Sequence, residues 1–254
     1  MNNTHEFENE IALISDTTVP YALAALYQEP FQYQKNYAEI TGSIPAGWFL
    51  SWFGDICPPY EEMVLSNDDI CHTLCFTNAQ WTKVRSLLIK QEILKYRTEK
   101  KQTFFSLNDD KVEWLLRHRP RDEKEDIINT LFPFILGVNR LHCAALTALG
   151  VSLNAVILLA WLIDTLPAKP LNEREPVSTP ILIDYKNITA DTFLSKRQIA
   201  NALTELSKIN IVNTQENQDD KEKYSTIYFN VLGNIAEKYI ENIPTGGNHD
   251  EYAP

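Results

Sequence analysis

Long hydrophobic runs, cysteine and glycine are all scarce in this sequence. The longest apolar stretch, Ala155 to Ile163, is far shorter than the roughly 20 residues that a membrane-spanning helix needs. Four cysteines without regular spacing predict no disulfide framework and are typical of a reducing cytosol. Eight glycines are too few for a collagen-like or linker-rich chain. The first ten residues, MNNTHEFENE, lack the basic and apolar segments of a signal peptide, so we expect a cytoplasmic protein with no membrane contact.

Signatures of catalysis and of metal binding are missing as well. The sequence contains no Gly-rich phosphate loop, nucleophile elbow or metalloprotease helix. Cys57, Cys71, His72 and Cys75 together could suggest a metal site, but core packing is the expected role of these cysteines. We therefore expect no enzyme, no metal and no cofactor.

Acidic charge dominates the chain, but unevenly. The formal net charge is −11, which argues against a general nucleic-acid binder. Residues 1–62 hold nine acidic side chains against the single Lys35, whereas residues 63–121 hold eleven basic side chains against seven acidic ones, a net of +4. Residues 122–254 are acidic again, with a net of −7. One basic segment therefore lies within an acidic protein.

An internal repeat organises the chain. The segment that begins at Ser43 recurs at Ser152 with an offset of 109. Residues 64–96 recur at 182–214 with an offset of 118. The hydrophobic content of 44% suffices for a folded core in each copy. One unit of about a hundred residues is therefore present twice.

The sequence pattern of each copy predicts three helices. The first is apolar, the second is short and centred on Ile70 or Ile188, and the third is amphipathic. A short apolar segment, 63–65 or 181–183, precedes the small helix. The expected N-caps of the apolar and amphipathic helices are Ser43, Thr77, Ser152 and Ser195.

A hairpin is expected to follow the helices in each copy. Its first strand begins at Ile93 or Ile211. Its returning strand is predicted at 103–107 and at 226–231, the latter from matching the pair Phe104-Phe105 to Tyr228-Phe229 at an offset of 124. The expected fold class is mainly α with small β-hairpins, as two tandem winged helix-turn-helix domains.

Composition also predicts the domain boundaries. Pro120 and the dense charge of HRPRDEKED are unsuited to a core. The segments 1–37, with a helix candidate at Tyr21–Tyr27, and 127–149 are expected to brace the two domains. The predicted divisions are a first domain at 1–117, a charged linker at 118–126, a second domain at 127–243 and a flexible tail at 244–254.

Each copy resembles the winged-helix domains of phage and plasmid replication-initiation and regulatory proteins of bacteria. The matching residues are Ser43-Ile44-Pro45-Ala46 with Leu50-Ser51, Thr77-Asn78-Ala79-Gln80 through Leu88 to Ile93-Leu94, Ser152-Leu153-Asn154-Ala155, and Ser195-Lys196-Arg197-Gln198 through Leu206 to Ile211-Val212. The glycine usual before the strand is replaced by Glu92 and Asn210. The resemblance implies DNA recognition by the helices that open at Thr77 and Ser195, in a replication initiator or a transcription regulator.

The residues expected to contact duplex DNA fall on the two amphipathic helices and on the first hairpin. Base readers belong near a recognition helix N-terminus, and hairpin cations belong against phosphate. On the helices the candidates are Asn78, Gln80, Lys83, Arg85, Lys196, Arg197, Gln198 and Asn201. On the first hairpin they are Lys95, Arg97, Lys100 and Lys101. Residues 81–108 carry a net of +5, whereas acidic residues predominate in the second hairpin, so only the first is predicted to bind phosphate.

Other interpretations stay open at this point. The cations could simply form solvated helix faces. Tandem winged helices also serve as protein adaptors, so an acidic adaptor or inhibitor that acts on a host complex is the alternative function. Duplex DNA is the expected partner, with a protein partner and a homodimer left open. Trp48, Trp52 and Trp161 lie in the repeated apolar helix and are predicted to be core rather than base-stacking residues.

Overall fold

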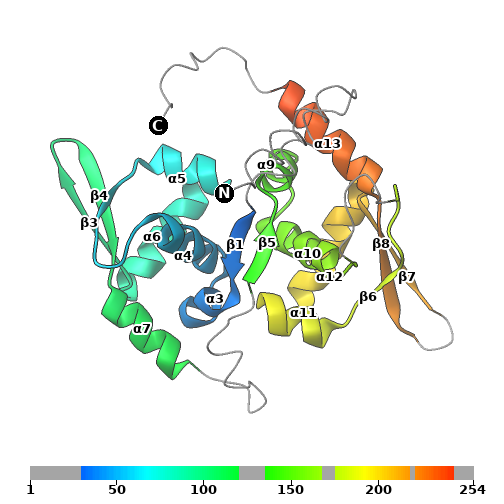
Figure 1. Cartoon of the computed structure of the whole chain (residues 1–254), viewed down its shortest axis with the longest axis horizontal. Helices are drawn as coiled ribbons and strands as arrows, with labels where there is room; N and C mark the ends of the chain where they lie inside the picture. The colour runs from blue at the N-terminus through cyan, green and yellow to red at the C-terminus, as the bar shows by residue number, and fades with distance from the viewer. Residues whose placement is uncertain (1–29, 120–134, 168–174, 218–220, 243–254) are drawn as a thin grey trace, which may run out of the picture.

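The computed structural model is mainly helical, with small antiparallel sheets (Figure 1), as the sequence predicts. It describes residues 30–119, 135–167, 175–217 and 221–242. The helix candidate Tyr21–Tyr27, most of the predicted linker and the tail 244–254 lie outside these residues. Among the described helices, none has the length and apolarity to cross a bilayer.

The same series of elements occurs twice along the chain. The first series is β1 (Phe31–Gln34), α3 (Lys35–Thr41), α4 (Ile44–Ile56), β2 (Met63–Val64), α5 (Asn67–Leu74), α6 (Asn78–Lys90), β3 (Leu94–Glu99), β4 (Gln102–Leu107) and α7 (Asp109–His118). The second is β5 (Ile135–Val138), α9 (Arg140–Ala148), α10 (Leu153–Asp164), β6 (Ile181–Leu182), α11 (Tyr185–Thr192), α12 (Lys196–Lys208), β7 (Val212–Glu216), β8 (Lys223–Ile227) and α13 (Phe229–Glu241). The antiparallel sheets β2-β4-β3 and β6-β8-β7 also have the same strand order.

Local sequence explains where the repeated helices begin. The hydroxyl oxygens of Ser43 and Ser152 each accept the N–H of the residue three positions later, which caps α4 and α10. Both helices are buried over most of their length because nearly every residue in them is apolar. Trp48, Trp52 and Trp161 are core residues, as expected.

The end of α6 and of α12 requires a left-handed residue. Glu92 has a φ of 60° and Asn210 a φ of 58°. These are the positions where the resemblance leads one to expect glycine, which adopts such angles without steric cost. Both halves therefore keep the backbone conformation although neither keeps the glycine.

The predicted returning strand at 226–231 is wrong. Strand β8 ends at Ile227, and helix α13 begins at Phe229. The pairing Met63↔Phe105 corresponds to Ile181↔Ser225, so the true offset here is 120 rather than 124. Phe105 is thus replaced in the second half by the small, buried Ser225, whose hydroxyl hydrogen-bonds Thr214 Oγ1 at 3.0 Å. Matching by aromatic identity failed because this core position does not keep its aromatic ring.

Strands β1 and β5 join the two halves. They pair antiparallel, Phe31 with Val138 and Gln34 with Ile135. The first residue of each strand therefore lies opposite the last residue of the other strand. Figure 1 shows this pair between the two sets of helices. Such a register relates the halves by an approximate two-fold axis through the strand pair.

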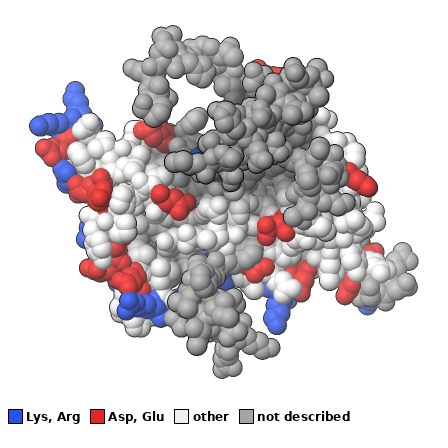
Figure 2. All heavy atoms as spheres, in the orientation of Figure 1, with Lys and Arg blue, Asp and Glu red and all other residues white. Residues whose placement is uncertain are grey.

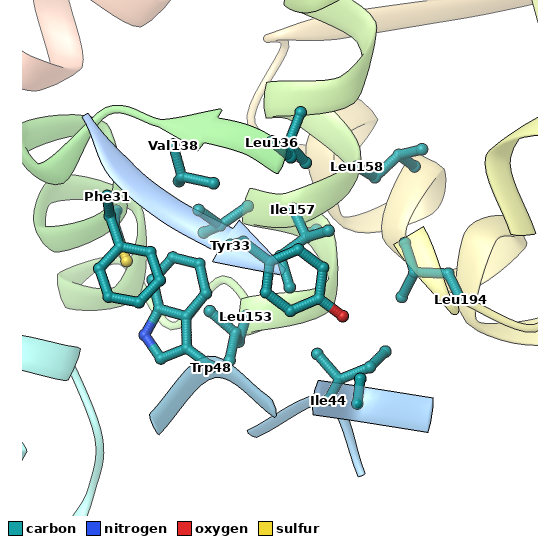
Figure 3. Close-up of a cluster of buried hydrophobic side chains, with 14 of the residues drawn as sticks. Phe31, Tyr33, Ile44, Trp48, Leu136, Val138, Leu153, Ile157, Leu158 and Leu194 are labelled. Carbon is teal, nitrogen blue, oxygen red and sulfur yellow. The ribbon is translucent and has the colours of Figure 1, made fainter. Parts of the chain in front are cut away.

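A continuous hydrophobic core surrounds this strand pair (Figure 3). Phe31 stacks on Trp48 with ring centroids 3.9 Å apart. The Tyr33 hydroxyl donates a buried hydrogen bond of 3.0 Å to the carbonyl of Thr192, at the end of α11 in the other half. Burial raises the pKa of Tyr33 well above its ordinary value. The two halves therefore share one core rather than sitting side by side as independent units.

The start of the predicted linker packs more tightly than expected. Arg119 is buried, and its Nε lies 3.2 Å from Glu39 Oε2. Glu39 also pairs with Lys35 at 3.0 Å. The expectation that charge excludes this segment from the interior fails at Arg119 because a carboxylate on α3 offsets the cost of burying the guanidinium.

Candidate nucleic-acid interface

Helices α6 and α12 open with capping boxes. The Thr77 N–H donates to Gln80 Oε1 at 2.8 Å, and the Gln80 N–H donates to Thr77 Oγ1 at 3.2 Å. Ser195 and Gln198 make the same pair of bonds at 2.9 and 3.3 Å. The N-cap predictions at Thr77 and Ser195 are confirmed, and each helix start is fixed by two reciprocal bonds.

These capping boxes constrain the two glutamines predicted as base readers. A paired contact with adenine needs both the oxygen and the nitrogen of the amide. The oxygens of Gln80 and Gln198 already accept the N-cap N–H groups. Reading adenine in that way would break the capping box, so their capping role competes with the predicted readout.

Helix α12 presents an exposed polar stripe opposite its buried face. Ile199, Ala202, Leu203 and Leu206 are buried. Lys196, Arg197 and Asn201 are exposed at the N-terminal end of the helix, as predicted. Since Arg197 and Asn201 are four positions apart, they project from one face of the helix.

Helix α6 carries a weaker set of exposed residues. Asn78 and Lys83 are exposed, and Asn78 Oδ1 accepts a hydrogen bond from the thiol of Cys71. Arg85 turns instead toward the hairpin, because its Nη1 donates to Asn67 Oδ1 at 3.3 Å and its guanidinium lies 5.9 Å from the centre of the Tyr96 ring.

Asn67 organises this region although sequence reasoning did not single it out. Its side-chain oxygen accepts from the Trp81 indole N–H at 2.8 Å as well as from Arg85. This contact joins the start of α5 to α6. No sequence signal identifies it, because the partners are 14 and 18 residues away and are brought together only by the fold.

The β2-β4-β3 sheet separates the predicted hairpin cations. Phe105 faces α6, where its ring meets Trp81 with centroids 6.0 Å apart. Arg97 lies over Phe104 on the opposite face, at 4.0 Å from the ring centre. Lys95 shares that face with Arg97 because alternate strand residues point the same way. The basic side chains of residues 81–108 therefore do not form one surface.

Arg97 is also engaged by acidic groups. Its guanidinium contacts Glu62 and Glu99, both at 2.7 Å. The hydrogen bonds from Arg97 lower the pKa of Glu62. A phosphate would have to displace these carboxylates, so Arg97 is a poorer phosphate ligand than its charge alone predicts.

Lys100 and Lys101 form the two-residue turn between β3 and β4. The pairing Glu99↔Gln102 leaves only these two residues in the loop. Both have positive φ, 49° and 71°, the geometry of a type I′ turn that usually selects Asn-Gly. Both are exposed, and Figure 2 shows basic side chains at the free end of this hairpin, at the upper left.

Most of the predicted cations have no acidic partner within the part of the chain that the structure describes. No ion pair with another described residue involves Lys83, Lys95, Lys100, Lys101, Lys196 or Arg197. In the second hairpin, by contrast, Lys223 lies 3.9 Å from Glu216. Asp219 and Asp220, which made that hairpin acidic in the sequence, lie outside the described residues.

The cysteines lie in or beside the core. Cys57 and Cys143 are buried, and Cys71 and Cys75 pack against the hydrophobic cluster. Within the described ranges no three His, Cys, Asp or Glu side chains come together as metal ligands would.

Neither the protein-family models nor the curated proteins compared with the chain give a match.

Proposed function

We propose that the protein binds duplex DNA through two winged helix-turn-helix units, with α6 and α12 as recognition helices. The first unit comprises helices α4 to α6 and the sheet β2-β4-β3, and the second comprises α10 to α12 and the sheet β6-β8-β7. In each unit the last two helices, α5–α6 or α11–α12, form the pair that meets across a short turn. The exposed Lys196 and Arg197 open α12, where groove-reading side chains belong. A replication initiator or a transcription regulator of a mobile element would use such an arrangement.

The turn at Lys100 and Lys101 is the observation that carries this proposal. Non-glycine residues in left-handed conformations are costly, and such strain concentrates at functional positions. Two lysines in this turn place positive charge at the point of the hairpin farthest from the core. That position suits contact with a phosphate backbone.

Selection from a randomised duplex library at low salt, followed by fluorescence anisotropy across salt, tests this proposal. We expect an enriched site and an affinity that falls steeply as salt rises, because bound cations release counterions from DNA. The variant Lys100→Ala/Lys101→Ala should bind all sequences more weakly, with a salt slope smaller by about 2. The variant Lys196→Ala/Arg197→Ala should relax base preference.

The matched control is Lys238→Ala, which removes an exposed lysine from α13, an element that belongs neither to the first hairpin nor to the proposed recognition helices. Its affinity and salt slope should equal those of the unmodified protein. If no duplex is retained at low salt, or if Lys238→Ala weakens binding as much as the hairpin variant does, DNA binding through these units is refuted.

The acidic surface favours a protein-binding adaptor as the second candidate. Acidic side chains predominate over the first half in Figure 2, away from the hairpin tip, and Arg97 is engaged by Glu62 and Glu99. Such a surface would attract a basic partner and mainly speed association, so salt would slow the association rate and leave dissociation little changed. Retention of a basic protein from the native host, with no retention of duplex, would favour this function.

A further inference from the structure

A cavity lies in the second half among β5, α9, α10 and α13. Its volume of about 520 Å³ falls in the range of small-molecule sites. Most of the described residues that line it are apolar, and Leu146, Leu159 and Phe229 come from three different helices. Two of these helices, α9 and α13, pack against each other (Figure 1). None of the described lining residues belongs to α6 or α12, so the cavity is separate from the proposed recognition helices.

The first half has an aromatic ring in the corresponding place. Tyr37 of α3 lies beside α4, and its hydroxyl would be 3.7 Å from a Cβ atom added at Gly54. At the offset of 109, Gly54 corresponds to Ile163, which lines the cavity. The next residue, Asp164, lines it as well. Helix α9 contains no phenylalanine, tyrosine or tryptophan. The cavity therefore adjoins the part of α10 whose counterpart on α4 is covered by a tyrosine ring.

The polar groups of the cavity favour a ligand that donates hydrogen bonds. His142 lines it, and burial lowers the pKa of this histidine to about 4, so its ring is neutral at pH 7 and one nitrogen can accept. No other described residue makes a hydrogen bond or ion pair to this ring. Asp164 and Glu175 are the two carboxylates among the described lining residues, which include no lysine or arginine. Both carboxylates are exposed, so they can pair with a cationic group where the cavity meets solvent.

We propose that this cavity binds a small aromatic amine, with the ring among the apolar side chains and the ammonium group at the carboxylates. The ring takes the place that corresponds to that of the Tyr37 side chain in the first half. An N–H group of the ring donates to His142, and the ammonium group pairs with Asp164 and Glu175. An aromatic acid of similar size would bring a further negative charge to these carboxylates and would be repelled. This proposal does not depend on DNA binding.

Tryptamine is the probe for this site, because it combines an indole N–H with an ammonium group. Isothermal titration calorimetry on the full chain at pH 7 should show saturable binding to one site. Indole-3-acetate has the same ring system and the opposite charge, and it should bind more weakly by about tenfold or more. Absence of saturable tryptamine binding, or equal affinity for indole-3-acetate, would overturn the proposal.

Ala160→Phe tests where the ligand binds. Ala160 lines the cavity from α10 and is partly exposed, so a phenylalanine side chain there fills space that the indole ring needs. We expect this variant to lose tryptamine binding, and urea denaturation verifies that it is folded. Tryptamine binding that persists in the folded variant would contradict the assignment of the ligand to this cavity.

Asp164→Asn provides a second test that changes only an exposed side chain. It should weaken tryptamine binding by about fivefold, the effect of losing one exposed ion pair. Binding of 3-methylindole, which has the same ring system and no charge, should not change. The matched control is Asp55→Asn, because Asp55 is the counterpart of Asp164 on α4, and it should leave both affinities unaltered. Equal effects of the two substitutions on tryptamine, or equal effects of Asp164→Asn on the two ligands, would refute the pairing of the ammonium group with this carboxylate.

Discussion

Gly47 on α4 lies against Ala38 of α3. A Cβ atom at this position would lie 2.5 Å from the backbone nitrogen of Ala38, and rigid backbone cannot yield easily. We expect Gly47→Ala to lower the free energy of unfolding by about 1–3 kcal/mol, because the two helices must separate. Urea denaturation measures this change.

The control for this substitution is Gly233→Ala in α13, where an added Cβ would meet no atom within 4 Å. Here alanine should stabilise the protein by about 0.5–1 kcal/mol through helix propensity. Equal effects of the two substitutions would contradict a steric role for Gly47.

His142 makes stability depend on pH. Desolvation by burial lowers its pKa to about 4, whereas an unfolded histidine titrates near 6.5. Between these values the unfolded chain binds the proton more readily, so stability is complete above about pH 6.5 and is lost as the pH falls toward 4. At pH 5 the expected loss relative to pH 7 is about 2 kcal/mol.

Urea unfolding of His142→Gln at both pH values checks this expectation, since the variant should show a smaller difference by that amount. His118→Gln serves as the comparison because His118 is exposed and stacked on Trp114. If both variants keep the full pH dependence, another group is responsible.

Sequence reasoning identified exposed residues better than it identified their partners. The exposure of Lys196, Arg197 and Asn201 follows from the spacing of apolar residues on α12. The engagement of Arg97 by Glu62 does not, because the two residues are 35 positions apart and meet only through the β2–β4 pairing. Contacts between side chains that are distant in the sequence leave no local sequence pattern from which they could be predicted.

At the scale of elements, the two lysines at the tip of the first hairpin supply positive charge but destabilise the turn that they form. We expect Lys100→Asn/Lys101→Gly to raise the free energy of unfolding by about 1 kcal/mol, because Asn and Gly tolerate the left-handed turn. If the hairpin contacts phosphate, the same variant should bind duplex DNA more weakly.

Thermal denaturation and anisotropy on this variant are compared with those on Lys100→Ala/Lys101→Ala, which removes the same charges without relieving the turn. The alanine variant should lose affinity to the same extent but gain no stability. A gain of stability in both variants would show that lysine repulsion, rather than backbone strain, destabilises the turn.

Helices were predicted more completely than strands. Serine and threonine N-caps followed by helical periodicity located α4, α6, α10 and α12. Strands β1 and β5 escaped prediction because each has four residues and is stabilised by the other across roughly a hundred positions of sequence. Helices α7 and α13 were not predicted, because neither begins with the side-chain cap hydrogen bond that marks the starts of α4, α6, α10 and α12.

At the scale of the whole molecule, Tyr33 couples the two halves. Its hydroxyl donates to the Thr192 carbonyl inside the shared core. We expect Tyr33→Phe to lower the free energy of unfolding by about 1–2 kcal/mol, because the buried carbonyl loses its partner. Hydrogen exchange should show faster opening of amides in both halves.

Tyr60→Phe provides the control, since Tyr60 is exposed and its hydroxyl donates to the surface carboxylate of Asp110. This change should leave stability within about 0.5 kcal/mol of the unmodified protein. Faster exchange confined to the first half of Tyr33→Phe would argue against coupling.

The symmetric register of β1 and β5 has an implication for how the chain associates. Strands β1 and β5 occupy equivalent positions in the two halves and pair antiparallel about a two-fold axis. Most homodimers assemble through a self-complementary contact of this kind. Here one polypeptide supplies both members, so the contact is satisfied internally at any concentration. Dilution therefore cannot separate β1 from β5, and a second copy of the chain cannot insert a strand between them.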